Sequence, residues 1–378
     1  MAVASRARLA LASIFFAYGI IVGTWAPHIP LAKERLAASP GWFGFGLLSL
    51  SLGAILAMPL AGGAVARLGS ARMAAVAAAL AGLTLIGPFL APDLGLFALA
   101  LLVLGAGLGT LDVAMNAQGL IVERALGKPV ISLLHGIYSA AGLVGAGLSA
   151  VLIGHLDEPV RALVTTLACL AIAAVAHRHL IVEAAPARSG PMLVLPSRAT
   201  IGLGLLCFLA LLIEGTTIDW AGIHLRENRG ASGNLASLAF GLYSGGMAVS
   251  RIVGDRFRLK FGSPALLRWC GLLTGAATLL AIFSPLPLVT LAALTVAGLA
   301  IGPIAPVLFA GGGRAEPDNP GHGIAAVTTL GYSGWLLGPA LVGLMAEAMG
   351  LALALALVAA TALIITLNAG RAAVADRI

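Results

Sequence analysis

The chain contains few charged residues. Only 10% of its 378 residues are Asp, Glu, Lys or Arg, whereas a soluble protein carries roughly 25%. Hydrophobic residues make up 60% of the chain, and the mean hydropathy is +1.04. This composition excludes an ordinary soluble domain and predicts an integral membrane protein.

Cysteines and catalytic motifs are also scarce. The three cysteines, Cys169, Cys207 and Cys270, all lie in apolar runs, which favours core residues over a disulfide or a metal site. No metal-ligand spacing, no nucleophile with a paired base and no ATP-binding glycine loop is present. We therefore expect no enzyme activity, no metal and no cofactor. The net charge of +7 is assigned to loop arginines, and nucleic acid is not an expected partner.

Long apolar runs recur along the chain, and strands of alternating polarity are absent. Runs of about 20 residues are long enough to cross a bilayer as helices. The sequence predicts an all-α membrane protein with twelve transmembrane helices, at about 9–28, 44–66, 73–91, 94–121, 130–154, 160–180, 199–221, 236–254, 265–283, 286–310, 322–346 and 350–369. The first run lacks a cleavage site and is interpreted as an uncleaved helix.

A polar segment divides the helices into two sets of six. It predicts an N-terminal half at 1–181, a cytoplasmic linker at 182–198 and a C-terminal half at 199–378. With the N-terminus inside, 17 of the 22 lysines and arginines lie on the cytoplasmic side. Because cytoplasmic loops are enriched in these residues, both termini are predicted to be cytoplasmic.

The two halves repeat each other at a nearly constant offset. Leu68-Gly69-Ser70 matches Phe261-Gly262-Ser263 at a shift of 193. Similar shifts relate three further pairs: Glu123 and Glu316, Tyr138-Ser139 and Tyr332-Ser333, and Trp25-Ala26 and Trp220-Ala221. An internal duplication of six spans is typical of transporters that bind substrate between the halves near the midplane. We therefore expect the helices at positions 1, 4, 5, 7, 10 and 11 to line a central cavity.

The helix predicted at 94–121 carries the most polar stripe. At helical spacing Asp112, Asn116 and Glu123 share one face. An Asp at the centre of a membrane helix costs about 2.5–3.5 kcal/mol, so such groups usually mark an ion or substrate path. A structural carboxylate bonded to a neighbouring helix is the alternative. Gly105 and Gly109 form a G-x-x-x-G, which predicts a close helix crossing.

Twelve spans in two halves with a central polar loop resemble the major facilitator superfamily. That family usually carries G-x-x-x-D-R-x-G-R-R between its second and third helices. The segment here begins Gly62-Gly-Ala-Val-Ala66-Arg67, with Ala66 in place of the acid. The second half keeps Arg251 and Asp255, which at i, i+4 are expected to pair. The resemblance implies gating roles for Arg67, Arg251 and Asp255.

Two stretches resemble the fucose-permease-like sugar:proton symporters. Leu111-Asp112-Val-Ala-Met-Asn116 is similar to their L-E-x-A-A-N segment, and His135-Gly-Ile-Tyr138 opens the next helix as in that branch. The resemblance implies that Asp112 is the proton-linked group and that the protein lies in a bacterial inner membrane. Those symporters carry a second acid where this chain has Trp25-Ala26-Pro27.

Two further stretches look like poorly characterised bacterial relatives of that branch, Glu214-Gly-Thr-Thr-Ile-Asp219-Trp220 and the segment from Gly331 to Pro339. Glu214 is predicted to be either a second proton-coupling group or a structural buried acid. Asp219 lies about 140° round the helix, and we assign it to a gate or an interfacial cap.

The remaining candidates are substrate contacts. His135 is either a proton relay to Asp112 or a hydrogen bond between helices. Tyr138, Tyr332 and Trp335 suit stacking on a sugar-like ligand, with helix packing as the alternative. Asn116 is preferred to Gln118, which lies about 200° away on the same helix. Gly302-Pro303 is predicted to kink its helix.

Together these features predict a proton-coupled secondary transporter of a small polar solute. The expected partners are that solute, protons and the lipid bilayer, and the chain is expected to be a monomer. Efflux of drugs or metabolites on the same fold is one alternative. A non-transporting membrane receptor or scaffold is the other, whereas a passive channel is disfavoured by the duplication.

Overall fold

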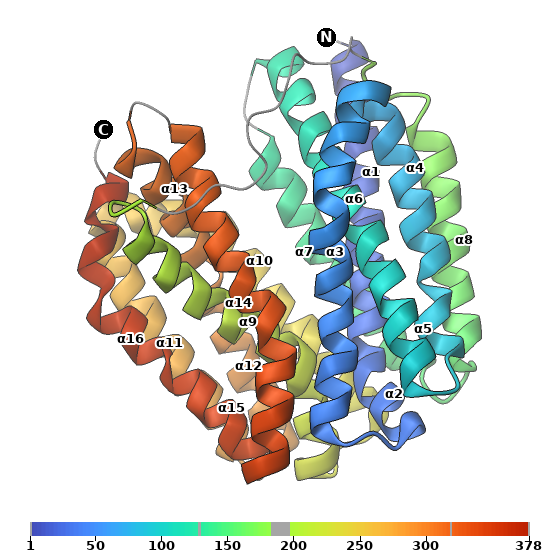
Figure 1. Ribbon diagram of the computed structural model, residues 1–378, viewed down its shortest axis with the longest axis vertical. Helices are drawn as coiled ribbons and strands as arrows, with labels where there is room; N and C mark the ends of the chain where they lie inside the picture. Colours follow the sequence, from blue (N-terminus) through green and yellow to red (C-terminus); the bar gives the residue numbers. More distant parts are fainter. Residues whose placement is uncertain (1, 128–129, 183–196, 318–319, 377–378) are drawn as a thin grey trace. The chain divides into compact units, whose positions relative to one another are not determined.

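The computed structural model describes residues 2–127, 130–182, 197–317 and 320–376, and these residues form helices and no strand (Figure 1). The chain clusters into two compact units. Unit 1 comprises Met1–Ala38 and Phe45–Met192, and unit 2 comprises Ser39–Gly44 and Leu193–Ile378. Most of the predicted linker, residues 183–196, lies outside the described residues.

The segment Ser39–Gly44 clusters with unit 2, although the sequence places it in the N-terminal half. The Glu347 carboxylate accepts hydrogen bonds from the Ser39 hydroxyl at 3.0 Å and from the Gly41 amide at 2.7 Å. A carboxylate on the free amides of a helix start satisfies donors that have no partner within the helix. The contact therefore explains this grouping.

Unit 1 contains a core of small and aromatic residues between α1, α4, α6, α7 and α8. Its elements are α1 Ala2–Trp25, η1 Ala26–His28, α2 Ile29–Leu36, α3 Pro40–Leu68, α4 Ser70–Thr84, α5 Ile86–Leu90, α6 Leu94–Leu126, α7 Ile131–Leu152 and α8 Glu158–Ala176. α1 packs on α7 and α8, and α4 packs on α6 and α8. Phe15 and Phe97 are fully buried among them.

Unit 2 is built around α9, which packs on α14 and α10. Its elements are α9 Ile201–Arg229, α10 Gly233–Phe261, α11 Ser263–Phe283, α12 Pro287–Ile301, α13 Ile304–Ala315, α14 Pro320–Met349, α15 Leu351–Ala360, α16 Ala362–Leu367 and η2 Ala369–Asp376. Trp220 on α9 and Tyr243 on α10 are its largest fully buried side chains.

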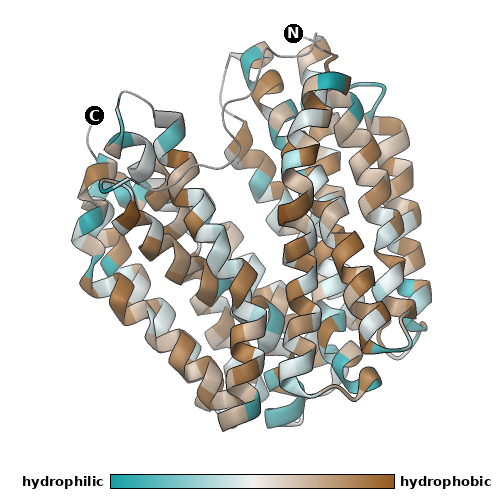
Figure 2. Ribbon diagram, in the orientation of Figure 1, coloured by the Kyte–Doolittle hydropathy of each residue, from teal (hydrophilic) through white to brown (hydrophobic). Residues whose placement is uncertain are grey.

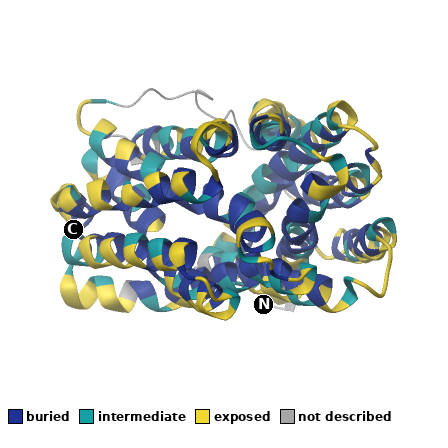
Figure 3. Cartoon of the chain, turned by 90° about the horizontal axis from the view of Figure 1, so that it is seen from below, coloured by how far each residue is buried: buried dark blue, intermediate teal, exposed yellow. Residues whose placement is uncertain are grey.

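Each predicted span corresponds to a helix or a broken pair of helices. In the described part of the chain, ten helices are long and apolar enough to cross a membrane, and Leu351–Leu367 with Ala369–Asp376, bent by 53°, makes an eleventh. The more polar α10 completes the twelve-helix all-α membrane fold. Apolar residues cover the bodies of the helices, and polar residues gather toward their ends (Figure 2). Within each unit, exposed residues lie on the outward faces (Figure 3).

Several helices extend beyond their predicted ends, and proline and glycine explain two of these cases. The first helix does not stop near His28, because the chain continues through η1 into α2 and ends at Leu36. Pro27 and Pro30 sit in the first turns of these helical segments, where a missing N–H costs nothing. Similarly, α9 continues to Arg229 and ends at Gly230, whose φ of +61° is a glycine conformation.

The sequence match between Leu68-Gly69-Ser70 and Phe261-Gly262-Ser263 extends to their backbone conformation. Gly69 has φ +82° and ψ +147°, and Gly262 has φ +79° and ψ +159°. In both units the glycine ends one helix and a serine begins the next. Only glycine adopts this conformation readily. At Gly302-Pro303, where the sequence predicts a kink, the helix is interrupted between α12 and α13.

Close helix crossings are repeated at the same offset. A Cβ atom at Gly105 on α6 would overlap the Leu50 carbonyl of α3, and one at Gly298 on α12 would overlap the Tyr243 carbonyl of α10. Both pairs are related by a shift of 193. The same shift relates two further crossings: Gly53 on Leu102 with Gly246 on Thr295, and Gly109 on Ala54 with Gly302 on Met247. The duplication therefore extends to the packing of backbones.

Candidate functional site

The polar cluster of unit 1 joins α6 to α7. Asn116 Nδ2 donates to Asp112 Oδ1 at 3.2 Å and to the Asp112 carbonyl at 2.9 Å. Asn116 Oδ1 lies 3.1 Å from His135 Nε2. All three side chains are partly exposed. The structure thus brings together the predicted acid, amide and imidazole in one chain of hydrogen bonds.

Aromatic rings hold this cluster against α1. Phe15 meets His135 edge-on with ring centroids 5.3 Å apart, and Tyr18 lies 5.1 Å from Tyr138. A Cβ at Gly19 would overlap the Tyr138 carbonyl, so α1 and α7 pack with their backbones in close approach. Phe15 and Tyr18 are not among the site residues predicted from the sequence. Their i, i+3 spacing, which matches that of His135 and Tyr138, was the available signal.

The other polar residues of α6 have structural partners. Gln118 is fully buried, accepts from the Ser70 hydroxyl at 2.6 Å and donates to the Ile181 carbonyl at 3.1 Å. Its place on another face agrees with the choice of Asn116. The Glu123 carboxylate accepts from the Val130 and Ile131 amides at 2.8 and 3.1 Å. Glu123 therefore caps the start of α7. Of the polar face predicted on this helix, Asp112 and Asn116 form the hydrogen-bonded cluster.

The polar cluster of unit 2 is an ion pair between neighbouring helices. Glu214 on α9 is 8% exposed, and its Oε1 lies 3.5 Å from Arg251 Nη2 on α10. Arg251 Nε also reaches the Gly302 carbonyl at 3.5 Å. A Cβ at Gly215 would overlap the Trp335 ring, so this aromatic side chain packs directly beside the acid's neighbour. A cation therefore balances the acid of unit 2, unlike that of unit 1.

The predicted gating residues do not come together within the units. Arg251 is paired with Glu214, and the side chain of Asp255 lies outside the described residues. Arg67 is exposed at the end of α3 and has no hydrogen bond or ion pair to any described residue. Asp219 is partly buried, likewise has none among the described residues, and does not join Glu214. A gating role for these residues stays a prediction.

The aromatic candidates of α14 differ in exposure. Tyr332 is 41% exposed, and its ring centroid lies 6.5 Å from that of Phe309 on α13. Trp335, one turn further along α14, is partly buried against α9. Trp335 packs against Gly215, the residue that follows Glu214 of the polar cluster of unit 2.

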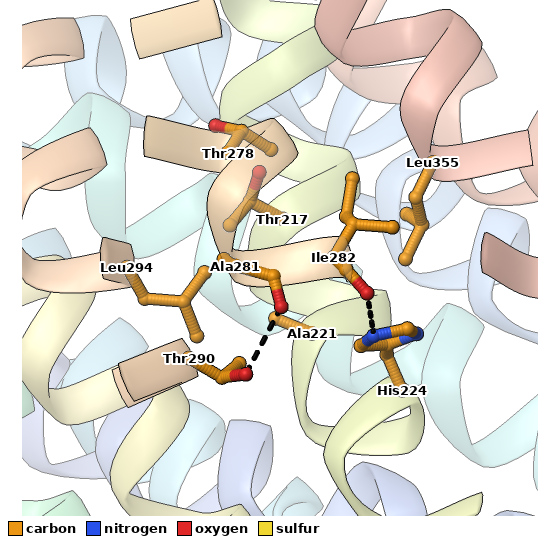
Figure 4. Close-up of a pocket in the computed structure, with 9 residues that line it drawn as sticks. All are labelled: Thr217, Ala221, His224, Thr278, Ala281, Ile282, Thr290, Leu294 and Leu355. Carbon is orange, nitrogen blue, oxygen red and sulfur yellow. Dashed lines mark hydrogen bonds between the residues drawn. The ribbon is translucent and has the colours of Figure 1, made fainter. Parts of the chain in front are cut away.

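Unit 2 also contains a small pocket (Figure 4), and neither residue of the ion pair lines it. Its volume is about 20 Å³, with Thr217, His224, Thr278 and Thr290 among its lining residues. His224 Nε2 lies 3.0 Å from the Ile282 carbonyl, and the Thr290 hydroxyl donates to the Ala281 carbonyl at 3.0 Å. A space of this size holds about one water molecule. The pocket is therefore too small for a solute.

The two clusters differ in what they can do chemically. In unit 1 a carboxyl group is bonded to an amide and, through it, to an imidazole, groups that accept or donate hydrogen bonds without a fixed charge. Such an acid can take up and release a proton. In unit 2 a carboxyl group is paired with a guanidinium, which places a positive charge beside the acid and joins α9 to α10.

Comparisons with known proteins cover nearly the whole chain. No family model matches it. An uncharacterised MFS-type transporter of Yersinia pestis is 32% identical over 356 residues, which is 94% of this chain and 93% of the relative. Membrane protein MosC of Rhizobium meliloti is 29% identical, with 94% and 88% covered. An uncharacterised transporter of Sinorhizobium fredii is 30% identical, with 89% and 90% covered.

Solved structures share the fold at low sequence identity. The nucleoside transporter NupG superposes with a TM-score of 0.75 at 12% identity, covering 98% of this chain and 99% of NupG. An inward-facing bacterial homologue of the human lysosomal transporter Spinster gives 0.71 at 15%, covering 99% and 97%. These two similarities concern the fold, whereas the relative from Yersinia pestis also shares the sequence. The chain therefore belongs to the major facilitator superfamily of membrane transporters.

Proposed function

We propose that this transporter is proton-coupled, moves a small polar solute across a bacterial inner membrane by alternating access, and uses Asp112 as its protonation site. The observation that carries the proposal is the hydrogen-bonded chain from Asp112 through Asn116 to His135. It links an acid within a membrane helix to the next helix. Intramembrane acids with polar partners commonly belong to ion or proton pathways.

The neutral partners of Asp112 are what suit it to this role. A charged carboxylate that enters a dry state of the transport cycle loses its hydration at a cost of several kcal/mol. Protonation removes the charge, and here it leaves no cation unpaired because Asn116 is neutral. His135 would sense the change through the same amide. The proton thus alters the hydrogen bond between α6 and α7.

Glu214 is proposed as a second ionisable group whose role differs. It is paired with Arg251, so its protonation would leave a guanidinium in unit 2 without its carboxylate partner. For the solute we propose Asn116, His135 and Tyr138 as contacts in unit 1. The proposed contacts in unit 2 are Tyr332 and Trp335.

The solute is proposed to be sugar-like. Tyrosine and tryptophan rings with polar tips suit a ligand that offers both an apolar face and hydroxyl groups. NupG, which shares the fold, is named as a nucleoside transporter, so nucleosides belong in the test set beside free sugars. A thermal-shift screen of both classes on the purified protein identifies the solute, because a ligand that binds the native state raises its melting temperature.

The coupling test uses the identified solute in proteoliposomes. We expect Asp112→Asn to retain solute binding and counterflow exchange but to lose accumulation driven by a pH gradient. Asp93→Asn is the matched control, since Asp93 caps the same helix by accepting from the Leu96 amide at 2.9 Å and Asn caps equally well. This control should accumulate solute normally.

Three outcomes would contradict the proposal. Normal accumulation by Asp112→Asn would make that acid structural. Exchange without accumulation in Glu214→Gln alone would move the coupling site to unit 2. No movement of a solute that binds the intact protein would favour a receptor.

A further inference from the structure

Both units carry a Trp-His-Arg set at one end. In unit 1 the set is Trp25, His28 and Arg35, and in unit 2 it is Trp220, His224 and Arg229, at shifts of 194 to 196. The match between the tryptophans is visible in the sequence. The equivalence of His28 with His224, and of Arg35 with Arg229, rests on their contacts in the structure.

Both arginines donate hydrogen bonds to backbone carbonyls at the end of a helix. Arg35 Nη1 donates to the Phe89 carbonyl at 2.6 Å, and its Nη2 donates to the Pro88 carbonyl at 2.8 Å, at the end of α5. Arg229 Nη2 donates to the Ile282 carbonyl at the end of α11. Phe89 and Ile282 are related by the shift of 193. Each arginine thus satisfies carbonyls that a helix end leaves without a partner.

The histidines lie against the same two residues. The His28 ring stacks on Phe89 with centroids 3.9 Å apart and an interplanar angle of 11°. His224 instead uses Nε2 to contact the Ile282 carbonyl at 3.0 Å. Among the residues that the structure describes, the imidazole of unit 2 therefore has a hydrogen-bond partner and the imidazole of unit 1 has none.

The units differ in the helix that closes this end. In unit 1, α8 contributes Glu158, whose Oε2 lies 3.6 Å from His28 Nε2 and accepts from Arg35 Nη1 at 2.9 Å. In unit 2 the residue at the same offset is Leu351. Leu355, one turn further along α15, lines the small pocket together with His224 (Figure 4). An acid that faces the histidine is thus present in unit 1 and replaced by an apolar residue in unit 2.

His28 is held in an unusual state for a buried imidazole. It is fully buried, and neither ring nitrogen has a hydrogen-bond partner among the described residues. The charged groups that face it are Glu158 and Arg161 from α8 and Arg35 from α2, whereas Trp25 from α1 and Phe89 from α5 supply uncharged walls. Burial and the two guanidinium groups oppose a proton on this ring, and the Glu158 carboxylate favours one. Unpartnered buried nitrogens cost about 1–3 kcal/mol each, so they call for an explanation.

We propose that His28 and Glu158 form a proton-binding site in unit 1 that unit 2 has lost or never had. The geometry supports it: the imidazole Nε2 and the Arg35 guanidinium both point at one carboxylate oxygen. The Glu158 side chain is 27% exposed while His28 is 0% exposed. The acid therefore connects solvent to the buried ring.

The step balances with one proton from water. A hydronium ion protonates Glu158, which passes the proton to the lone pair of His28 Nε2 in the tautomer that carries its hydrogen on Nδ1. A new N–H bond forms, the ring becomes a cation, and Glu158 returns to the carboxylate. The new N–H donates to Oε2 and competes with Arg35 Nη1 for that oxygen. Proton uptake therefore weakens the contact of Arg35 with Glu158 and changes how α2 is held to α8.

Tryptophan fluorescence tests the site without any solute, so its failure would leave the proposed role of Asp112 untouched. The Trp25 ring centroid lies 5.9 Å from that of His28, and a protonated imidazole quenches a neighbouring indole. The purified full-length protein in nanodiscs is scanned from about two pH units above 6.5, the ordinary histidine value, to about three below it, because burial and the two arginines oppose protonation of the ring. We expect a reversible loss of emission on acidification that Trp25→Phe abolishes.

The duplication supplies the matched control. His28→Gln should abolish the transition, whereas the equivalent change His224→Gln should leave it in place. Glu158→Gln should move the midpoint to lower pH, because a carboxylate beside an imidazole favours the protonated ring. Glu158 is partly exposed, so this variant is expected to fold even if the variant of the buried His28 does not.

Several results would overturn the site. One is a transition that survives His28→Gln or Trp25→Phe. Another is a transition lost equally in His224→Gln. An unchanged midpoint in Glu158→Gln, or no transition in the unmodified protein, would do the same.

Discussion

Unit 1 and unit 2 share their backbone packing but not their charges. Gly105 on α6 and Gly298 on α12 meet the carbonyls of Leu50 and Tyr243 in equivalent crossings. By contrast, Asp112 in unit 1 is bonded to neutral groups, and Glu214 in unit 2 is paired with a cation. The duplicated fold therefore carries two different polar clusters.

The difference has a physical reason. A crossing in which a Cβ would overlap a carbonyl accepts only glycine, so both copies must keep it for the helices to pack. A polar side chain can change without moving a helix, provided that its new partner is supplied nearby. The glycines at helix crossings are therefore the same in both units, whereas the polar side chains and their partners differ between them.

The largest expected effect is on the ion pair of unit 2. Arg251→Met leaves the Glu214 carboxylate without its cation, and removal of one partner of a buried pair costs about 3–5 kcal/mol. We expect a marked fall in melting temperature. The double variant Arg251→Met, Glu214→Gln should recover most of the loss, because it removes the unpaired charge. If the double variant is no more stable than the single one, the pair is not the source of the effect.

The glycine crossings come next. Gly105→Ala and Gly298→Ala should each destabilise the protein by about 1–3 kcal/mol, because the added methyl group overlaps a backbone carbonyl. Gly63→Ala is the control, since nothing lies within 4 Å of its added Cβ and alanine favours a helix. The melting temperatures of the three variants test this prediction. Tolerance at one crossing and not at the other would break the equivalence of the units.

A smaller effect on stability is expected at the acid of unit 1. Asp112→Asn should change the free energy of unfolding by less than about 1 kcal/mol, because an amide retains a hydrogen bond to Asn116. Its large effect should appear in coupling and not in melting temperature. A loss as great as that of Arg251→Met would show that Asp112 holds the fold together and would remove the contrast between the clusters.

The smallest effect concerns Glu316, the counterpart of Glu123. Hydrogen bonds from Ser197 and from His322, at 2.5 Å, lower the pKa of Glu316 below its usual 4.5. A carboxyl group whose pKa is lower in the folded protein than in the unfolded chain stabilises the fold at pH values above the unfolded-state pKa. This contribution is lost as the pH falls through the folded-state pKa. Glu316→Gln should therefore flatten the acid side of a plot of melting temperature against pH. A curve that superposes on that of the unmodified protein would contradict this.

Much of the architecture could be predicted from local sequence. Span positions follow from runs of apolar residues, since a helix is the structure that satisfies its own backbone in lipid. The turns at Gly69 and Gly262 and the break at Gly302-Pro303 were predictable because glycine and proline act on their own backbone. The helical stripe of Asp112 and Asn116 needed only the spacing of one helix.

Partners of polar side chains were decided by tertiary structure. Arg251 contacts Glu214, Glu123 caps α7, and Arg35 reaches Glu158 across 123 residues of sequence. Each contact depends on how far a helix is rotated about its axis, and helix packing over the whole unit sets that rotation. The sequence by itself determined a duplicated twelve-helix membrane protein, because hydropathy and glycine turns act locally. Only the folded chain decided which acid is balanced by a cation and which histidine faces an acid.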